Sequence, residues 1–322
     1  NRDGSWFYLK LDEGITKFNI KIDDELKQFT NEVGGSLLFD YDLKKNNWFN
    51  IGGKTKRFFK PESLKDLSNF IKKFGHKENF FILGAGSNIL LSDNTFDGTV
   101  IKMGKTFSNI SILSNETIIA GSAVLDKKLA EYAMENNIGG LEFLSCIPGT
   151  VGGGLKMNSG CYKKEFKDIL ISVQAMDKNG NIITIPSSKI KFGYRETNLD
   201  KDLIFLSASF KGKFKEKEEI KETIKILKAK KELAQPTKIK TGGSTFKNPI
   251  NQTNEKVWKL IKRSVDHDKR FGDAKISEKH CNFFINSNKA TSRDMKNLIK
   301  FVQESVKSKT GFNIETEIII ID

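Results

Sequence analysis

The sequence contains few cysteines and few prolines for its 322 residues. Cys146, Cys161 and Cys281 are an odd number and show no CxxC spacing, which argues against a disulfide framework and against a zinc site. We therefore expect three reduced thiols in a cytoplasmic protein, and no metal centre. With five Pro, 38% hydrophobic residues and 25 Phe, the composition excludes a disordered chain, because such chains lack the apolar surface that offsets the entropy of ordering.

Long apolar runs are absent as well. No stretch reaches the roughly 18 uncharged apolar residues of a membrane-spanning helix, so we predict no membrane insertion. The N-terminus carries Asp3, Asp12 and Glu13 and lacks a basic start followed by an apolar core, so no secretory signal is visible. Because the first residue is Asn1, a trimmed chain or a removed presequence remains an alternative.

Positive charge is in excess, since 54 Lys and Arg against 40 Asp and Glu give a formal charge of +14. A nucleic-acid binder, an enzyme for polyanionic small molecules and a simple lysine-rich bias all fit this balance. The lysines are spread along the chain and mixed with acids, as in residues 211–231, which we interpret as a solvated helix face. We therefore predict no nucleic-acid partner, although phosphate-bearing ligands would also match the charge.

The length exceeds the usual size of one hydrophobic core, so we expect two or three domains that can bury a ligand between them. Hydrophobic periodicity predicts strands alternating with helices, and the Lys178-Asn179-Gly180 turn predicts a hairpin. We predict helices at 24–30, 126–136, 211–233, 255–263 and 292–309. A further helix is predicted to begin at 61–63. Predicted strands span 80–83, 99–103, 117–120, 169–176, 182–186, 203–210, 283–286 and 313–322. In the last strand, alternation places Glu315, Glu317 and Ile319 on one face, and its apolar end predicts burial on both faces.

A glycine-rich loop follows the predicted strand at 80–83, with the sequence Gly84-Ala85-Gly86-Ser87-Asn88. Glycines let the backbone approach a diphosphate, and successive amides can then point at its oxygens. A Rossmann site is the obvious competitor, but Ile89 stands where a small residue is needed, and 92–94 predict a turn where a helix should continue. An ordinary tight turn is the other alternative for this loop on its own.

A second glycine-rich loop spans 147–160. It contains Ile147-Pro148-Gly149-Thr150-Val151-Gly152-Gly153-Gly154 and ends in Met157-Asn158-Ser159-Gly160. Because the loop is long and has few charges to solvate it, we interpret it as a rigid cradle for a phosphate or a flat ring rather than as a structural turn. Two such cradles in one half of the chain favour a dinucleotide.

These loops and several further motifs resemble the UDP-N-acetylenolpyruvoylglucosamine reductase (MurB) family, whose FAD-binding half is similar to that of vanillyl-alcohol-oxidase flavoproteins. The resemblance covers roughly Leu37 to Asp322 in order, and the set of motifs is specific. The short spacing between Arg195 and Ser244 resembles the subclass that lacks an extra tyrosine-bearing loop. Matching segments are 49–53, 84–88, 147–153, 157–158, 192–195, 243–249, 272–274, 277–280 and 315–317.

The resemblance implies an α+β fold with a two-subdomain FAD-binding module of the vanillyl-alcohol-oxidase type and a C-terminal α+β substrate domain. On this basis we place an N-terminal extension at 1–24 and the first FAD-binding subdomain at 25–104. The second subdomain then spans 105–235, with the boundary at Gln235-Pro236, and the substrate domain spans 236–312. The strand at 313–322 returns near the active site.

The implied reaction is the NADPH-dependent reduction of UDP-N-acetylglucosamine enolpyruvate to UDP-N-acetylmuramate through tightly bound FAD, in peptidoglycan precursor synthesis. In the family a serine corresponding to Ser244 donates the proton to the substrate carbon, and Arg195 and Glu317 match residues that flank the substrate carboxylate. A turn or cap role for Ser244 and a rim salt bridge for Glu317 are the alternatives. Another FAD-dependent oxidoreductase of the same superfamily, or a non-enzymatic binding module, would be the rival function.

The resemblance also implies the ligand contacts of a monomeric enzyme. His280 is interpreted as architectural, and Ile319 stands where the family commonly has an arginine, so one anionic contact is missing or is supplied by a lysine. The implied FAD-binding residues are Gly84, Ala85, Gly86, Ser87, Asn88, Pro148, Gly149, Thr150, Gly152, Gly153 and Asn158. The implied substrate-binding residues are Tyr194, Lys247 and Asn248.

Overall fold

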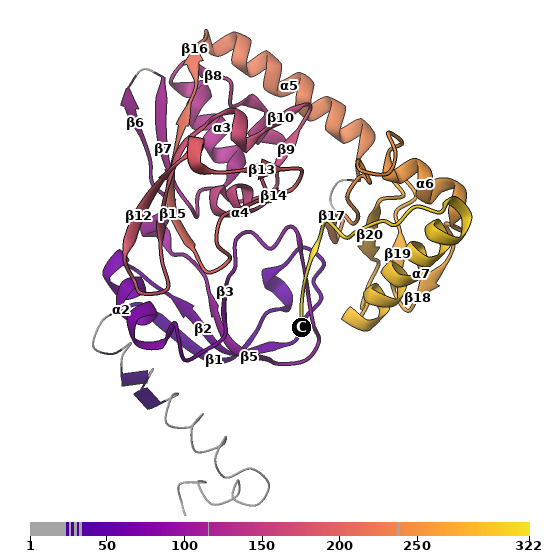
Figure 1. Cartoon of the computed structure of the whole chain (residues 1–322), viewed down its shortest axis with the longest axis horizontal. Helices are drawn as coiled ribbons and strands as arrows, with labels where there is room; N and C mark the ends of the chain where they lie inside the picture. The colour runs from indigo at the N-terminus through magenta and orange to yellow at the C-terminus, as the bar shows by residue number, and fades with distance from the viewer. Residues whose placement is uncertain (1–23, 26, 29–30, 32–33, 115, 237–238) are drawn as a thin grey trace, which may run out of the picture.

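The computed structural model describes residues 24–25, 27–28, 31, 34–114, 116–236 and 239–322 (Figure 1). The predicted extension at 1–24 lies outside these ranges except for Asp24, and the described residues of the predicted helix at 24–30 are helical. Within the described ranges, three sheets of four or five strands carry the architecture. We name them the first, second and third sheet in chain order.

The first sheet is mixed and is covered by one helix, α2 (Leu64–Phe74). Adjacent residues of β2 point to opposite faces, so Phe59 stacks on Phe70 of the helix while Phe58 stacks on Tyr41 on the other side. Ser63 caps α2 in a reciprocal capping box with Asp66, so the helix begins where residues 61–63 predict its start. The strand order is β1 (Ser36–Asp42), β2 (Lys54–Lys60), β5 (Phe96–Ile101) and β3 (Phe80–Ile82).

The second sheet is antiparallel throughout and contains the predicted hairpin, with Gly180 in a left-handed conformation. Its strand order is β12 (Ile182–Pro186), β11 (Leu170–Met176), β15 (Ile204–Lys211), β7 (Thr117–Gly121) and β6 (Ile110–Ser114). Its helices are α3 (Asp126–Glu135), α4 (Val151–Lys156) and α5 (Lys217–Ala234), and in Figure 1 α5 extends from this part of the molecule toward the third sheet. Short pairs are β8 (Ile138–Gly139) with β16 (Lys213–Phe214), β9 (Gly160–Cys161) with β10 (Lys164–Glu165), and β13 (Phe192–Gly193) with β14 (Glu196–Thr197).

The third sheet is antiparallel and packs against α7 (Ser292–Thr310), which in turn packs on α6 (Val257–Ser264). Thr291 caps the start of α7, and Gly311 ends it in the left-handed conformation that glycine tolerates best. The strand order is β17 (Thr241–Ser244), β20 (Phe283–Asn286), β19 (Ala274–Ile276) and β18 (Arg270–Phe271). The 3-10 helices of the described chain are Lys44–Asn46, Lys105–Ser108, Glu142–Cys146, Phe166–Asp168 and Ser187–Lys189.

The final segment leaves the third sheet and joins a strand that follows the first glycine loop. Of the predicted strand at 313–322, only β21 (Ile319–Ile321) forms a ladder, and it pairs in parallel with β4 (Ile89–Leu91). Residues 313–318 instead make single contacts, so the predicted shared face is wrong: Glu315 has 81% of its side chain exposed and Glu317 has 15%. Burial of the apolar end on both faces is also wrong, because Ile319 lines a cavity and is 42% exposed.

Two further element predictions need correction. The predicted loop at 147–160 contains the helix α4, in which Gly154 allows close packing: a Cβ there would lie 2.2 Å from the ring of Phe166. The helix predicted from 211 begins at Lys217, since β16 first pairs with β8. The strands of the three sheets fall at 36–101, 110–211 and 241–286, and the domain boundaries stay a prediction.

The first residue of α3 is an acid without a partner. Both carboxylate oxygens of Asp126 are buried and lack hydrogen bonds among the described residues, and burial raises its pKa well above the ordinary value. A raised native pKa means that the native state holds the proton more tightly than the unfolded chain, so the stability due to this group is complete below about pH 4 and is lost as the pH rises through the native pKa.

We therefore expect Asp126→Asn to stabilise the protein at pH 8, by roughly 1–3 kcal/mol for a buried unpaired group. The gain should shrink as the pH falls toward 4, because Asp126 is then protonated. Urea unfolding followed by circular dichroism at several pH values measures this, with Asp97→Asn on the surface as the control. An Asn variant that is less stable than the parent at pH 8 would contradict the unpaired state of Asp126.

No helix of the described residues is long and apolar enough to cross a membrane. In the same part of the chain, no group of three or more His, Cys, Asp or Glu side chains is arranged to hold a metal ion.

Candidate active site

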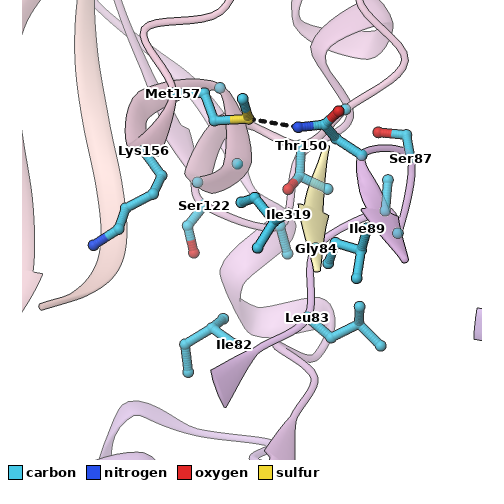
Figure 2. Close-up of a pocket in the computed structure, with 18 of the residues that line it drawn as sticks. Ile82, Leu83, Gly84, Ser87, Ile89, Ser122, Thr150, Lys156, Met157 and Ile319 are labelled. Carbon is cyan, nitrogen blue, oxygen red and sulfur yellow. Dashed lines mark hydrogen bonds between the residues drawn. The ribbon is translucent and has the colours of Figure 1, made fainter. Parts of the chain in front are cut away.

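A cavity of about 1470 Å³ lies where the three sheets meet. Its wall combines the first glycine loop, the second loop with α4 and the final segment (Figure 2). The end of β17 completes the wall. The volume exceeds the ~300–1,000 Å³ of a site for one drug-sized ligand. The predicted site residues in the wall are Gly84, Ala85, Gly86, Ser87, Asn88, Pro148, Gly149, Thr150, Gly152, Gly153, Arg195, Ser244 and Glu317.

The first glycine loop is held in place by its neighbours. Gly86 has a φ of +67°, and its carbonyl oxygen accepts a hydrogen bond from Trp48 N at 2.9 Å. Asn88 donates from Nδ2 to Met157 Sδ at 2.9 Å, the dashed line in Figure 2, and to the carbonyl oxygen of Glu317 at 3.0 Å. The loop therefore ties α4 and the final segment together. Since β4 follows it directly, a Rossmann arrangement is excluded.

The second loop is fixed by bonds to the segment after β7. Val151 N donates to Val124 O and Gly152 N to Ser122 O, both at 2.9 Å. Asn158 is fully buried, with a left-handed φ of +43°. It is absent from the cavity wall, because its amide is engaged by Glu165 Oε2, Gly193 O and Lys167 N. These bonds give Asn158 a structural role in the loop, and its direct contact with a cofactor stays a prediction.

The wall is open at one of the predicted glycines, Gly153, and is tighter at Gly84. A Cβ on Gly153 would have only Thr150 Oγ1 within 4 Å, at 3.6 Å, and a Cβ on Gly84 would meet only the same oxygen, at 2.8 Å. Ser122 Oγ, also in the wall, is buried and has no hydrogen-bond partner among the described residues. Exposed backbone facing an unsatisfied hydroxyl suits a ligand with phosphates and a polar ring. These residues therefore fit an elongated dinucleotide such as FAD.

An arginine and a glutamate meet at one side of the cavity. Arg195 Nε donates to Glu317 Oε1 at 2.9 Å, and Nη2 donates to the carbonyl oxygen of Gly160 at 3.0 Å. Arg195 is a non-glycine residue with φ +62°, in the turn between β13 and β14. Such backbone strain persists where the surroundings impose it, and here the fork of hydrogen bonds holds the guanidinium at the wall.

Burial controls the charge of this pair. It raises the pKa of Glu317 above the ordinary value, more than Arg195 and Lys247 lower it. Burial alone would lower the pKa of Arg195, but Glu317 and its other neighbours raise it. The arginine is thus always charged, while Glu317 takes up a proton more readily than an exposed glutamate. A side chain of Glu317 that is 15% exposed does not match the alternative of a rim salt bridge.

Ser244 ends β17 and faces the cavity next to Gly243, which has a φ of +81°. The serine lies in a strand, so a helix-cap role is excluded. Among the described residues its Oγ makes no hydrogen bond. The next residue, Thr245, accepts a hydrogen bond at its carbonyl oxygen from Glu317 N at 2.8 Å. This contact brings the backbone of the serine and that of the glutamate side by side.

The predicted substrate residues lie behind this pair, outside the wall. Asn248 Nδ2 donates to the Tyr194 hydroxyl at 3.0 Å, and the guanidinium of Arg195 lies 5.1 Å from the centre of the Tyr194 ring. Lys247 Nζ lies 3.8 Å from Glu315 Oε2. Tyr194 and Asn248 therefore form a continuous group with Arg195, whereas Lys247 pairs with Glu315. The contact of these three residues with a substrate remains a prediction.

Sequence reasoning missed other wall residues, notably Lys102, Ser122, Cys146 and Cys161. A hydrogen bond from Cys161, the largest influence, lowers the pKa of Cys146 to about 6 despite its burial, and all three cysteines are free of disulfides. No signal marks these residues in the sequence, because a lone serine, lysine or cysteine after a strand has no distinctive spacing. Only the fold brings them to the cavity.

Comparison with known proteins gives a consistent result. Residues 55–186 match the FAD binding domain model, and residues 235–321 match the C-terminal domain of UDP-N-acetylenolpyruvoylglucosamine reductase. A reductase of that name from Pelagibacter ubique is 64% identical over 298 residues, covering 92% of this chain and 99% of the relative; one from Rickettsia canadensis is 41% identical, covering 89% and 96%. The crystal structure of the enzyme (MurB) from Thermus caldophilus superposes with a TM-score of 0.76 at 28% identity, covering 89% of this chain and 99% of that one.

Proposed function

The chain belongs to the UDP-N-acetylenolpyruvoylglucosamine reductase family of FAD-dependent enzymes, and we propose that it uses NADPH to reduce UDP-N-acetylglucosamine enolpyruvate to UDP-N-acetylmuramate for peptidoglycan precursor synthesis. The observation that carries the proposal is the convergence of Ser244 with the Arg195–Glu317 pair on a cavity lined by two glycine loops. Family membership displaces both rivals, a different flavin oxidoreductase and a non-enzymatic binding module.

The glycine loops would hold FAD, with Gly84 to Asn88 and Pro148 to Gly153 as its closest backbone. When bound, FAD supplies the hydride chemistry that links NADPH to the terminal methylene carbon of the enolpyruvyl group. The open position at Gly153 supports this assignment, because backbone without a side chain lets phosphate and ring atoms come close.

Arg195 would bind the substrate carboxylate. Its Nε is used by Glu317 and one Nη2 hydrogen by Gly160, while Nη1 lies 4.0 Å from Glu165 Oε1, beyond hydrogen-bond distance. Nη1 and the rest of Nη2 therefore retain donors for a carboxylate. As hydride reaches the methylene carbon, electron density moves toward the carboxylate, and a fixed positive charge stabilises the resulting enolate. A glutamate with a raised pKa can share its proton there without repelling the growing charge.

Ser244 would then protonate the carbon that bears the ether oxygen. Neutral serine is a weak acid, but an enolate carbon is basic enough to take the proton from a hydroxyl that is already aimed. The absence of a protein partner for Oγ among the described residues leaves this hydroxyl free for the task. The test is NADPH oxidation by the purified yellow protein, with and without the enolpyruvyl substrate. Substrate-independent oxidation at the full rate would refute the proposal.

Arg195→Lys should retain charge but lose the planar fork that holds a carboxylate. We expect substrate reduction to slow by about 10- to 100-fold, the value of one or two charge-assisted hydrogen bonds, while flavin reduction by NADPH stays near the parent rate. Stopped-flow absorbance separates the two half-reactions, and Arg263→Lys on the surface of α6 is the matched control. Equal slowing of both half-reactions would indicate that Arg195 only supports the fold.

A further inference from the structure

Several lysines of the cavity wall make no ion pair among the described residues, and one of them, Lys102, is bonded to the first glycine loop. Lys102 follows β5, is partly buried, and lines the cavity beside the first glycine loop. Its Nζ donates a hydrogen bond to the carbonyl oxygen of Gly84, the first residue of that loop. In the described part of the chain, no carboxylate lies within ion-pair distance of this ammonium group. The contact with Gly84 therefore fixes its position but does not neutralise its charge.

The surroundings of Lys102 are positive. Burial lowers its pKa, and the charge of Lys60 lowers it further, with no acid acting in the opposite direction. Lys60 also lines the cavity, and its ammonium lies 5.6 Å from the centre of the Phe58 ring. A partly buried cation next to another cation is unfavourable until an anion joins it. The protein supplies none here, so the anion has to come from the ligand.

We propose that Lys102 binds the diphosphate of FAD at the first glycine loop. This inference rests on the FAD site proposed above and adds a residue to it. A diphosphate brings the missing negative charge, and its oxygens accept charge-assisted hydrogen bonds from an ammonium group. NADPH and the nucleotide sugar also carry a diphosphate. The contact of Lys102 with Gly84 favours FAD, because that carbonyl belongs to the loop assigned to the flavin cofactor, whereas Arg195 and Glu317 mark the substrate side.

The test compares the parent apoprotein with Lys102→Met, which keeps the shape of the side chain and removes the charge. We expect FAD, titrated by flavin fluorescence, to bind about tenfold more weakly or worse. ADP, which competes through its diphosphate, should lose affinity to a similar extent, whereas riboflavin, which has no phosphate, should bind both proteins equally. KM for NADPH and for the nucleotide sugar should not change in the FAD-saturated enzyme.

Thermal melting of the two apoproteins gives a second and independent readout. Removal of an unpaired cation should leave the melting temperature of Lys102→Met equal to that of the parent or raise it, while FAD affinity falls. A residue that only supports the loop would lower both. Lys102→Arg should keep most of the FAD affinity, and Lys102→Gln, which retains a donor for Gly84, should lose it. Lys211→Met, exposed on β15 and remote from the cavity wall, is the matched control.

Several outcomes would overturn the inference. If Lys102→Met and Lys102→Gln bind FAD within twofold of the parent affinity, Lys102 does not contact the diphosphate. An equal loss of affinity for FAD and riboflavin would lead to the same conclusion. A higher KM for NADPH or the nucleotide sugar with unchanged FAD affinity would assign the lysine to another diphosphate. If Lys102→Met fails to fold, the FAD affinity of Lys102→Gln decides. A parent protein that binds no FAD would refute the proposed function itself, a result distinct from all of these.

Discussion

Ser244→Ala should lose at least about 100-fold in the rate at which the enolpyruvyl substrate reoxidises the reduced flavin, the typical effect of removing a positioned general acid. Flavin bleaching by NADPH should remain near the parent rate, because hydride transfer from NADPH requires no proton on the substrate carbon. Anaerobic stopped-flow absorbance of the flavin measures both half-reactions. The expected separation follows from the position of Ser244 at the wall, next to the backbone of Glu317.

Ser244→Cys provides the informative comparison, since a thiol is a stronger acid of similar reach and should recover part of the lost rate. Ser207→Ala, on β15 and away from the cavity wall, controls for the loss of a hydroxyl. Reoxidation of Ser244→Ala at the parent rate would mean that the proton comes from another group. Glu317, with its raised pKa, would then be the next residue to examine.

Gly153→Val should give a folded protein that has lost most of its FAD. The protein itself has room for the new side chain, since a Cβ there would meet only Thr150 Oγ1, at 3.6 Å, and φ is not in the left-handed region. The added methyl groups therefore enter the cavity, where they would overlap a ligand in close contact with the backbone. We expect FAD affinity to fall by about 100-fold or more, because the overlap and the lost contacts cost several kcal/mol of binding free energy.

The ratio of flavin to protein absorbance after purification, followed by FAD titration, measures this effect. Gly153→Ala should give a smaller loss, and Ala229→Val on the exposed side of α5 adds a branched residue to a helix without touching the cavity. Circular dichroism confirms that each variant is folded. Full flavin occupancy in Gly153→Val would place the cofactor away from the second glycine loop.

The sequence could predict that two glycine loops share a site, but not what each glycine does. Gly86 and Gly153 both lie in glycine-rich loops, yet a Cβ on Gly86 would lie 2.1 Å from the carbonyl oxygen of Asn46. A substitution there would disturb the fold as well as the ligand, so it tests nothing about FAD by itself. Distinguishing the two requires knowledge of which backbone lies behind each glycine, and that depends on tertiary packing.

The local elements were predicted well where one segment contains the whole signal. The start of α2 after residues 61–63, the hairpin at Gly180 and the strand at 283–286 all follow from nearby residues. The final segment was predicted poorly, because its path is set by distant partners: Glu317 N bonds to Thr245 O, and Ile319 N bonds to Asn88 O. The alternation of side chains between two faces holds only where a strand is paired in a regular ladder. In this segment only the residues of β21 are paired in that way.

The pairing of β21 with β4 also restricts how the third sheet can move. The C-terminal end of the chain lies near the first sheet in Figure 1, and its last residue, Asp322, also pairs with Lys296 of α7. The chain therefore passes between the third sheet and the first part of the molecule twice. A lobe joined by one connection can rotate about it as a hinge. A lobe held at two separate places is restricted to small sliding or shear motions. Opening this cavity by hinge rotation would break the three residue pairs of the β21–β4 ladder. Ligands therefore have to enter and leave through smaller motions of side chains and loops around a frame that stays closed.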